Sequence, residues 1–497
     1  MAIEVEDKFD VPEDYTIPEL TGVPGCAEVL GPRSYRLTAV YFDTPDLRLA
    51  AHGITLRRRR GGDDAGWHLK LPKAKGARHE IAHPPTRSAK VVPRELAELV
   101  LAHTRREELV PVAELETRRE VTTLRDADGR KLVEVADDQV KGTTFGTVFG
   151  EEPRVERWRE VEAELLDGDV DQLKKVGKAL RKAGAVPAAS GSKLARLLGP
   201  AGRAAELTRP PDGTAGRVVT DYLRSQVDAI IAQDPQVRRA TEDSVHQMRV
   251  AARRLRSALK AFSSVLGETG DLQDELRWIA GVLGEARDLE VIHERFAERL
   301  DSVDPSLVVG EIRTRLGDDL RERQRQALVR AHLAMSSERY FALLDRLDTL
   351  AAKPPLTPVA GKKAGKTLGR VADEQWRRVE KRYDRARAME DAEERALAMH
   401  DVRKAAKRAR YTAEALTPLL GDEAAALAKR AKDVQEVLGT YQDGVVAQEI
   451  LMEEADRARE AGEDTFTYGV LVATERADAA RSQAEFPGVW AEAARAG

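Results

Sequence analysis

The residues His246–Arg256 have the sequence HQMRVAARRLR, and the residues His400–Arg410 have the sequence HDVRKAAKRAR. The two stretches align without a gap, and the histidine and every following basic position match. A leucine-glycine pair and an aspartate follow each stretch at nearly the same distance, namely Leu283-Gly284 with Asp288 and Leu438-Gly439 with Asp443. Self-similarity of this kind indicates an internal duplication. We therefore expect two copies of one helical unit that face each other.

Each stretch predicts an amphipathic helix with a basic stripe. At 100° per residue, the first stripe consists of His246, Arg249, Arg253, Arg256 and Lys260, and the opposite apolar face consists of Met248, Leu255, Leu259 and Phe262. The second stripe consists of His400, Arg403, Lys407 and Arg410, with Val402, Ala405, Ala409 and Leu416 behind it. Such a helix can dock on a core through its apolar face while it presents the stripe.

The first basic stripe has no compensating acid on its own helix. No Asp or Glu occurs between His246 and Lys260, so like charges lie one helical turn apart. Two explanations are open: acidic residues of neighbouring helices balance the stripe, or a bound polyanion does, with phosphates matched to Arg and Lys. Nucleic acid is a less suitable polyanion, because the helices lack the interleaved aromatic residues that stack unpaired bases.

These paired His-x-x-Arg-x-x-x-[Arg/Lys]-Arg-x-Arg helices resemble those of CHAD domains, the conserved-histidine α-helical domains, which bind inorganic polyphosphate. The resemblance extends from about residue 217 to the C-terminus. It implies polyphosphate contacts at the motif positions, to which we add the last residue of the first stripe: His246, Arg249, Arg253, Arg254, Arg256, Lys260, His400, Arg403, Lys407, Arg408 and Arg410. It also suggests an association with polyphosphate granules in the cell.

The helical pattern fills the C-terminal part of the chain. From Arg217 onward, Ala, Leu, Arg and Glu recur at spacings of three and four, which is typical of helices. The segment 353–366, KPPLTPVAGKKAGK, interrupts this pattern, so we expect the two repeats at about 217–352 and 367–497. Residues 201–216 are rich in Gly, Pro and small residues, and we interpret them as a linker.

Residues 1–200 have a different pattern. Short alternating segments between turn clusters indicate antiparallel strands in a barrel or sandwich. The clearest segments are Ala2–Phe9, Leu37–Phe42, Trp67–Leu71, Lys131–Val135 and Arg159–Leu165. Helical insertions are expected at Pro93–Ala102 and at Asp171–Ala183, the second with Asp169 or Asp171 near its start.

Several of these strands turn a charged face in one direction. Residues two apart on a strand share a face, and this places together Glu4, Glu6 and Lys8, then Arg57 and Arg59, and then Glu160, Glu162 and Glu164. One such strand alone would suit an exposed sheet edge. Because several share the pattern, we expect a closed barrel whose interior forms a tunnel of mixed charge. The predicted fold class is α+β and multidomain: an antiparallel β-barrel, followed by an all-α domain of two duplicated helical bundles.

A tunnel of mixed charge suits phosphate chemistry. Carboxylates are hard oxygen ligands for Mg²⁺ or Mn²⁺, and Lys and Arg neutralise phosphate oxygens. A divalent ion held between phosphate and carboxylates polarises the phosphorus and can orient an attacking water. The pattern therefore favours metal-dependent hydrolysis of a phosphoanhydride.

This half resembles the CYTH superfamily, the triphosphate tunnel metalloenzymes that include thiamine triphosphatase and class IV adenylate cyclase. The match includes Glu4–Lys8, Tyr41–Pro45, Leu56–Arg59, Trp67–Lys70, Thr117–Arg119, Glu160–Glu162 and Ser192-Lys193. The resemblance implies that the triphosphate is held by Lys8, Arg57, Arg59, Lys70, Arg119 and Lys193. It implies metal ligands at Glu4, Glu6, Glu160 and Glu162, with Glu164 able to share the role of Glu162.

Two further positions follow from the same resemblance. Glu134 would support the water or a second metal ion, which makes the expected catalytic set Glu4, Glu6, Lys8 and Glu134. Members of the family often carry Asp at the position of Glu134, and Asp137 and Asp138 compete for it in the alignment. Asp43, within Tyr41–Pro45, is expected to have an architectural role, because Asp-Thr-Pro is favourable turn chemistry.

Composition restricts the remaining possibilities. The chain has 81 Lys plus Arg and 85 Asp plus Glu, a formal charge of −4, which argues against nonspecific electrostatic binding over the whole surface. Cys26 is the only cysteine, so an internal disulfide framework is excluded. The N-terminus has no leader pattern and no stretch is apolar enough to span a membrane, which predicts a cytoplasmic protein without a membrane partner.

Together these patterns predict a metal-dependent triphosphatase joined to a polyphosphate-binding helical domain, with Mg²⁺ or Mn²⁺ as cofactor. One alternative is a polyphosphate-binding scaffold whose tunnel binds without turnover. Another is a nucleotide cyclase, although the sequence has no recognisable adenine pocket. The oligomeric state is left open by the sequence.

Overall fold

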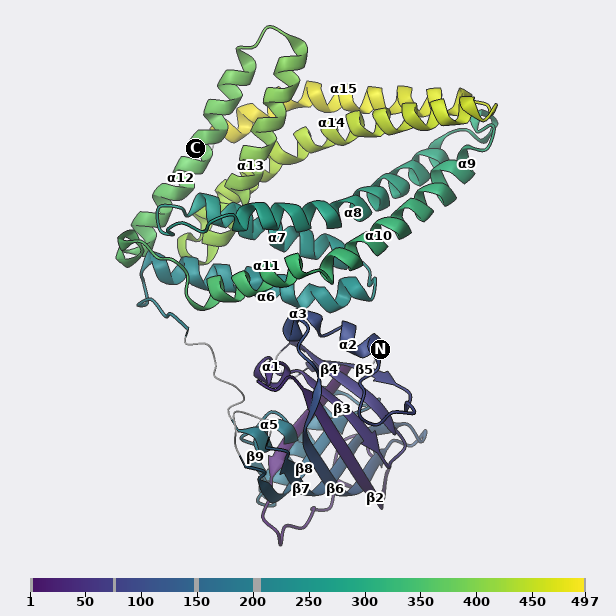
Figure 1. The fold of residues 1–497 in the computed structure, drawn as a ribbon, viewed down its shortest axis with the longest axis vertical. Helices are drawn as coiled ribbons and strands as arrows, with labels where there is room; N and C mark the ends of the chain where they lie inside the picture. The colour runs from purple at the N-terminus through teal and green to yellow at the C-terminus, as the bar shows by residue number, and fades with distance from the viewer. Residues whose placement is uncertain (1–2, 75–76, 147–151, 200–206, 496–497) are drawn as a thin grey trace. The chain divides into compact units, whose positions relative to one another are not determined.

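The computed structural model describes residues 3–74, 77–146, 152–199 and 207–495 of the chain. The chain divides into two compact units, 1–205 and 206–497 (Figure 1). The named strands belong to the first unit, and the long helices belong to the second. This is the α+β multidomain fold class that the sequence predicts.

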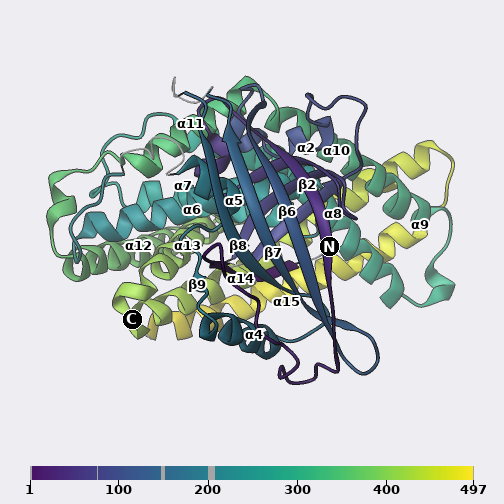
Figure 2. The ribbon, with the colours of Figure 1, turned by 90° about the horizontal axis from the view of Figure 1, so that it is seen from below.

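The first unit is an antiparallel barrel. Its strands are β1 (Ile3–Asp10), β2 (Glu28–Asp43), β3 (Thr55–Arg60), β4 (Gly66–Ala74), β5 (Ala77–His83), β6 (Val110–Arg125), β7 (Lys131–Thr144), β8 (Val155–Leu165) and β9 (Val186–Pro187). They follow the order β5-β4-β3-β2-β6-β7-β8-β1-β9, and an additional pairing of β1 with β5 closes the sheet. Figure 2 shows β2, β6, β7 and β8 side by side. Closure removes the edges that open sheets expose.

The core of this unit lies outside the barrel wall. Helix α4 (Val170–Lys182) covers the outward faces of several strands, where its Leu173 and Val176 pack with Phe9 and Val161. Asp169 is the N-cap of α4 and forms a capping box with Gln172, so the helix begins one residue before the predicted Asp171. The apolar residues therefore face outward under a helix, and the charged residues are left for the interior.

The helical segment predicted at Pro93–Ala102 is two short helices instead, which corrects the prediction. Helix α2 (Arg94–Glu98) and helix α3 (Leu101–Thr104) are separated at Val100, whose φ of −111° and ψ of 5° lie outside the helical region. Leu99 and Val100 are both buried. The unit also contains α1 (Arg48–Ala51) and α5 (Lys193–Leu198).

The second unit consists of two successive sets of helices. The first set comprises α6 (Ala215–Arg238), α7 (Ser244–Ala261), α8 (Leu272–Ser302), α9 (Ile312–Thr314), α10 (Leu320–Met335) and α11 (Glu338–Ala352). The second set comprises α12 (Ala364–Arg387), α13 (Ala392–Leu420), α14 (Asp422–Glu460) and α15 (Phe466–Arg495). Short non-α turns lie at Pro305–Leu307, Arg315–Asp319 and Pro358–Gly361. In Figure 1, α8 with α10 and α14 with α15 form two long hairpins.

Both sets of helices begin slightly earlier than the sequence suggests. Helix α6 begins at Ala215, inside the segment 201–216 that we interpreted as a linker, because the Thr214 hydroxyl accepts from the Arg217 N–H and caps the helix. Helix α12 begins at Ala364 rather than at residue 367, and the Ala364 N–H donates to the Gly213 carbonyl.

The two motif helices, α7 and α13, are amphipathic as predicted. Met248, Leu255 and Leu259 on α7 are buried, and so are Val402 and Leu416 on α13. The two helices pack against each other, and Arg254 of α7 donates to Glu414 of α13 at 2.9 Å. Their apolar faces therefore hold them in the core while their basic faces remain available.

Candidate functional sites

The barrel encloses a cavity of about 330 Å³ that is lined mainly by charged side chains. Its wall includes Glu6, Lys8, Tyr41, Arg57, Arg59, Asp64, Lys70, Glu80, Arg119, Glu134, Glu162, Glu164 and Lys193. All six basic residues that the CYTH resemblance assigns to triphosphate are among them. The alternation along the strands has thus brought these residues, which are distant in sequence, to one space.

The cations in the cavity are not equally compensated. Lys8 contacts Glu162 at 2.5 Å and Glu6 at 3.0 Å, and Arg59 pairs with Asp64. Arg57 forms no ion pair with any residue that the structure describes, and its Nη1 donates to the Tyr41 hydroxyl at 3.5 Å. Burial disfavours ionisation of Tyr41, but the Arg57 guanidinium outweighs burial and lowers the Tyr41 pKa. Arg57 is therefore a cation without a direct ion pair in the described residues, although the nearby acids Glu80 and Asp64 favour its charge.

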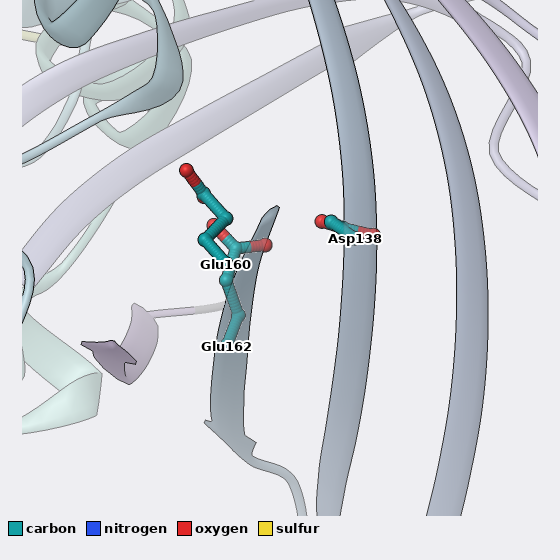
Figure 3. Close-up of side chains that lie close together, drawn as sticks. All are labelled: Asp138, Glu160 and Glu162. Atoms are coloured by element: carbon teal, nitrogen blue, oxygen red, sulfur yellow. The ribbon is translucent and has the colours of Figure 1, made fainter. Parts of the chain in front are cut away.

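Three buried carboxylates gather on one side of the cavity. Asp138 of β7 and Glu160 and Glu162 of β8 offer oxygen atoms that lie within 4.8 Å of one another (Figure 3). The Nζ of Lys193 lies among them, 3.0 Å from Asp138 and 2.7 Å from each glutamate. Arg119 adds a bidentate contact to Asp138 at 2.8 and 2.6 Å, and a further contact to Glu162 at 2.7 Å. We call these three acids the carboxylate triad.

Nearby cations favour the ionised form of two triad members, Glu162 and Asp138. Burial alone would raise the Glu162 pKa, but Lys193, Lys8 and Arg119 outweigh burial and hold that pKa well below its usual range. Lys193 and Arg119 lower the Asp138 pKa in the same way. Burial would lower the pKa of Lys193, whereas the three acids raise it. Glu162, Asp138, Lys193 and Arg119 therefore form a network of charged groups at neutral pH.

The triad has the donor chemistry of a hard divalent cation. Three carboxylates with converging oxygen atoms suit Mg²⁺ or Mn²⁺ better than soft metals. The Lys193 ammonium is bound by the same oxygens, so a metal ion and Lys193 would compete for them. The residues thus fit a metal ion, provided that Lys193 gives up part of its contacts.

The expected metal ligands are only partly together. Glu160 and Glu162 belong to the triad, whereas Glu6 and Glu134 line the cavity elsewhere. The side chain of Glu4 lies outside the described part of the chain. The third carboxylate is Asp138, one of the two residues that compete with Glu134 in the alignment. Its neighbour Asp137 faces outward and pairs with Arg159 at 2.7 Å.

Sequence reasoning missed a second acidic position in the cavity. The Glu80 carboxylate of β5 forms a hydrogen bond with His68 Nδ1 at 2.7 Å, and it lies 3.6 Å from the Lys70 ammonium. Burial works against the charge of Glu80, but His68, Lys70 and Arg57 lower its pKa to about 2. The position of Glu80 could have been inferred from its place opposite Lys70 in the β4–β5 hairpin. That inference requires the register of the hairpin, which the alternation pattern does not give.

Asp43 has a structural surrounding. Its carboxylate accepts from the backbone N–H groups of Thr44, Leu49 and Ala50 at 2.7 to 2.8 Å. Burial outweighs these hydrogen bonds and raises the Asp43 pKa to about 6. These contacts hold the turn that leads into α1, in agreement with the architectural role that we expected.

The second candidate site lies on the basic faces of α7 and α13. Arg249 of α7 contacts the Gly284 carbonyl at 3.3 Å and Asp288 at 3.0 Å, and Arg403 of α13 lies 3.7 Å from Asp443. A Cβ atom at Gly284 or at Gly439 would lie 3.1 Å from the guanidinium of the facing arginine. In each repeat, the glycine of the leucine-glycine pair and the aspartate that follows it thus form the binding position of the arginine, Arg249 or Arg403.

Acids of neighbouring helices compensate only part of the basic stripe. Besides Asp288 and Asp443, Glu414 binds Arg254 at 2.9 Å and Arg410 at 2.7 Å. Within the described ranges, Arg253, Arg256, Lys260, Lys407 and Arg408 have no ion pair. Burial, followed by Arg403 on the same helix and Arg253 on α7, lowers the Lys407 pKa to about 8. Both explanations of the stripe therefore apply, each to different residues.

The two motif histidines lie beside these cations. Burial, followed by nearby Arg and Lys charges, lowers the pKa of His400, and burial is also the largest cause at His246. The Nδ1 atom of His400 is buried and lacks a hydrogen-bond partner among the described residues. Both imidazoles are therefore disposed to be neutral at pH 7, when they can donate one hydrogen bond each.

Comparisons with known proteins agree with this division. The family model of the CYTH domain matches residues 2–198, and that of the CHAD domain matches residues 221–452. Uncharacterized proteins from two strains of Mycobacterium tuberculosis are 40% identical over 501 residues, which cover 97% of this chain and 95% of theirs. Within the described residues, no helix is long and apolar enough to cross a membrane.

Two solved structures resemble parts of the chain. PptA from Streptomyces chartreusis has a TM-score of 0.47 and 23% identity, over 56% of this chain and 99% of that protein. The CHAD domain from the plant Ricinus communis has a TM-score of 0.45 and 28% identity, over 58% of this chain and 96% of that domain.

Proposed function

The chain belongs to the proteins that join an N-terminal CYTH domain to a C-terminal CHAD domain, and we propose that it hydrolyses inorganic triphosphate or a related triphosphate. CYTH domains are triphosphate tunnel metalloenzymes. The reaction would take place in the barrel cavity with Mg²⁺ or Mn²⁺. The helical unit would bind inorganic polyphosphate.

The observation that carries this proposal is the convergence of six cationic side chains, interleaved with carboxylates, on one enclosed cavity. Arg57 has a phenol as its nearest polar contact rather than a carboxylate. Lys70, Arg59 and Arg119 line the same space. Guanidinium and ammonium groups bind phosphate oxygens through charge-assisted hydrogen bonds, so a wall with several of them is suited to a ligand with several phosphates. A triphosphate of three linked phosphates matches a row of such cations.

The residues of the chain have distinct roles in this proposal. Arg57, Arg59 and Lys70 hold one end of the phosphate chain and neutralise it. Lys8, Arg119 and Lys193 lie next to the carboxylate triad, where they stabilise charge on the phosphate that is cleaved. Asp138, Glu160 and Glu162 would hold the divalent ion, which when bound supplies Lewis-acid polarisation of the phosphate.

The test is phosphate release by the purified full-length protein from triphosphate, long-chain polyphosphate, thiamine triphosphate and ATP, each with Mg²⁺ and with Mn²⁺. We expect release from triphosphate that is abolished by chelation of the metal ion. Absence of release from every substrate contradicts the proposal. Cyclic nucleotide formation from ATP would identify a cyclase instead.

A binding-only tunnel is the second candidate, and the position of Lys193 favours it. Its ammonium already occupies the space among the three carboxylates. If this arrangement is permanent, the cavity binds triphosphate without a metal ion and without turnover. The substitution Lys193→Met distinguishes the two. Removal of this buried partner is expected to destabilise the barrel by about 3–5 kcal/mol.

The distinguishing measurement is the melting temperature of Lys193→Met with and without Mg²⁺. If the triad holds the metal ion, Mg²⁺ raises the melting temperature of the variant more than that of the unaltered protein, because the ion replaces the lost positive charge. An equal response, together with an inactive unaltered protein, favours the binding-only tunnel. Lys141→Met is a matched control, because Lys141 pairs with Glu116 on the exposed outer face.

Polyphosphate binding by the helical unit rests on the uncompensated part of the basic stripe. Arg253 and Lys407 both have lowered pKa values, which reflect burial and the repulsion of nearby arginines. A flexible polyanion relieves this repulsion and accepts hydrogen bonds from the guanidinium groups. The test is calorimetric titration of the full-length protein with long-chain polyphosphate. Failure to bind contradicts this part of the proposal.

A further inference from the structure

The duplicated helices differ at one aligned position in a way that makes the two ends of the basic stripe unequal. In the gapless alignment that pairs His246 with His400, Lys260 corresponds to Glu414. Glu414 neutralises positive charge at its end of the stripe, because it forms ion pairs with both Arg254 and Arg410. Lys260 adds a positive charge at the other end. The stripe therefore has one neutral end and one basic end.

The basic end contains further cations from α12. The Lys260 pKa is lowered by the charge of Arg408, by burial, and by Arg382 and Arg378 of α12. Acids partly offset the α12 residues, since Glu374 binds Arg378 at 2.5 Å and Asp401 lies 3.5 Å from Arg382. In the part of the chain that the structure describes, Lys260 and Arg408 have no such acid.

A pocket of about 430 Å³ lies between the segment after α7 and the start of α12. The pocket is lined by Ser264, Val359, Lys362, Lys363, Lys366, Thr367, Arg370, Val371 and Glu374. Ser264 follows Lys260 by four residues. The four basic residues of the pocket form no ion pair with any described residue. The glutamate in its wall is already engaged by Arg378.

The start of α12 adds to the anion-binding character of the pocket. Lys363 is the N-cap, its side chain does not cap the helix, and no acid occurs in the first turn. A helix of this length has a positive N-terminus that attracts an anion, although the Ala364 N–H already donates to the Gly213 carbonyl. The corresponding helix of the first repeat is satisfied internally: Thr214 caps α6, and Arg217 pairs with Asp221 at 2.6 Å and with Asp212 at 3.0 Å.

We propose that the polyphosphate groove is extended at one end only, past Lys260 and into the pocket formed by Lys362, Lys363, Lys366 and Arg370. The ligand of this pocket is the phosphate of a long inorganic chain that is also bound at Arg253 and Lys407. The inference rests on the proposed polyphosphate binding by the helical unit. From Arg249 to Lys260 the stripe runs about 16 Å along α7 at 1.5 Å per residue, so only a long chain reaches the pocket.

The experiment compares the full-length protein with the double variant Lys366→Glu and Arg370→Glu, in titrations with long-chain polyphosphate and with triphosphate. We expect the variant to bind long chains about tenfold more weakly, because two exposed attractive contacts become repulsive. Its phosphate release from triphosphate stays unchanged, because these residues are not part of the barrel cavity. The matched control is Arg321→Glu with Arg325→Glu, which makes the same change in net charge at the same spacing on α10.

A second variant changes the affinity in the opposite direction. Glu374→Gln removes the one carboxylate in the pocket wall and is expected to strengthen long-chain binding by about twofold to threefold. Unchanged affinity in the Lys366→Glu and Arg370→Glu variant, or an equal loss in the α10 control, overturns the extension. Failure of the unaltered protein to bind long chains overturns both the extension and the proposed binding function.

Discussion

The barrel cavity and the basic stripe both contain closely spaced cations, but the two sites hold them in opposite ways. In the cavity, Lys193 and Arg119 contact buried acids, and their pKa values are raised. On the stripe, Lys407 and Arg253 face other cations, and their pKa values are lowered. In the cavity, acids of the protein therefore neutralise Lys193 and Arg119, whereas on the stripe Lys407 and Arg253 are repelled by neighbouring cations.

This difference affects how each site accepts a phosphate ligand. A ligand in the cavity must exchange with carboxylates that already bind the cations, so binding there depends on a defined position and on a metal ion that engages the acids. A ligand on the stripe only has to relieve repulsion, so a flexible chain can bind in many registers. The cavity is thus suited to a short substrate and the stripe to a long polymer.

The largest effect is expected from loss of two members of the carboxylate triad. Glu160→Gln with Glu162→Gln should reduce phosphate release from triphosphate by roughly a thousandfold or more, since each charged group that organises the reaction is worth about 10²–10³. The measurement is phosphate release at saturating Mg²⁺, with circular dichroism as a check on the fold. Long-chain binding by the helical unit should be unaffected. Glu116→Gln, on the exposed face of β6, is the control.

The corresponding change on the stripe should have the converse result. Arg253→Glu with Lys407→Glu is expected to weaken long-chain binding by about a hundredfold, because two charge-assisted contacts are lost and reversed. Phosphate release from triphosphate should remain within error of the unaltered protein. If both activities fall together, the two sites are not independent and the comparison fails.

A smaller effect should appear as a pH dependence that only the stripe shows. The Lys407 pKa of about 8 lies below the usual value of a lysine, because burial, Arg403, Arg253 and Arg249 disfavour its charge and Asp443 opposes them only in part. Binding of long chains should therefore weaken by roughly threefold to tenfold between pH 7 and pH 9.5, as the ammonium loses its proton. Lys407→Met should lack this part of the pH dependence.

The same pKa predicts the stability of the ligand-free protein. Between pH 8 and pH 10.5 the unfolded chain binds a proton at Lys407 that the folded chain has lost, so stability rises with pH across that window. The measurement is the urea midpoint at several pH values, compared with Lys407→Met. A fall in stability from this residue over the same window would contradict the direction of the shift.

The smallest effect is expected from substitution of two glycines of α8, Gly281 and Gly284. Gly281→Ala and Gly284→Ala both replace glycine in α8, which favours the helix by about 1 kcal/mol. At Gly281 nothing lies within 4 Å of the added Cβ, whereas at Gly284 it would meet the Arg249 guanidinium at 3.1 Å. Gly281→Ala should therefore raise the melting temperature, and Gly284→Ala should not. Equal gains would show that the binding position of Arg249 is not tightly packed.

Much of the fold could be predicted from local periodicity. Alternation in β1, β3 and β8 identified which side chains face inward, and the three-and-four spacing in α7 and α13 identified their buried faces. These predictions succeed because strand and helix geometry fix the direction of neighbouring side chains.

The rest of the site depends on long-range register, which periodicity does not contain. Asp137 and Asp138 are adjacent and chemically alike, and only the pairing of Arg119 with Asp138 across β6 and β7 places the second one inside. Lys193 is the first residue of helix α5, so the alternation of inward and outward residues along the strands does not predict its contact with the triad. Likewise, the partial neutralisation of the stripe by Asp288, Asp443 and Glu414 required the packing of separate helices.

The pairing of β1 with β8 has a consequence for synthesis of the chain. The strand that carries Glu6 and Lys8 is synthesised well before its partner β8, which begins at Val155, and Lys193 follows still later. At about 5–20 residues per second, roughly 10–40 s pass between the first strand and Lys193. During that interval the nascent barrel has an open seam and an incomplete set of charges. We therefore expect the unit to gain its closed form only as the first helices of the second unit are being made.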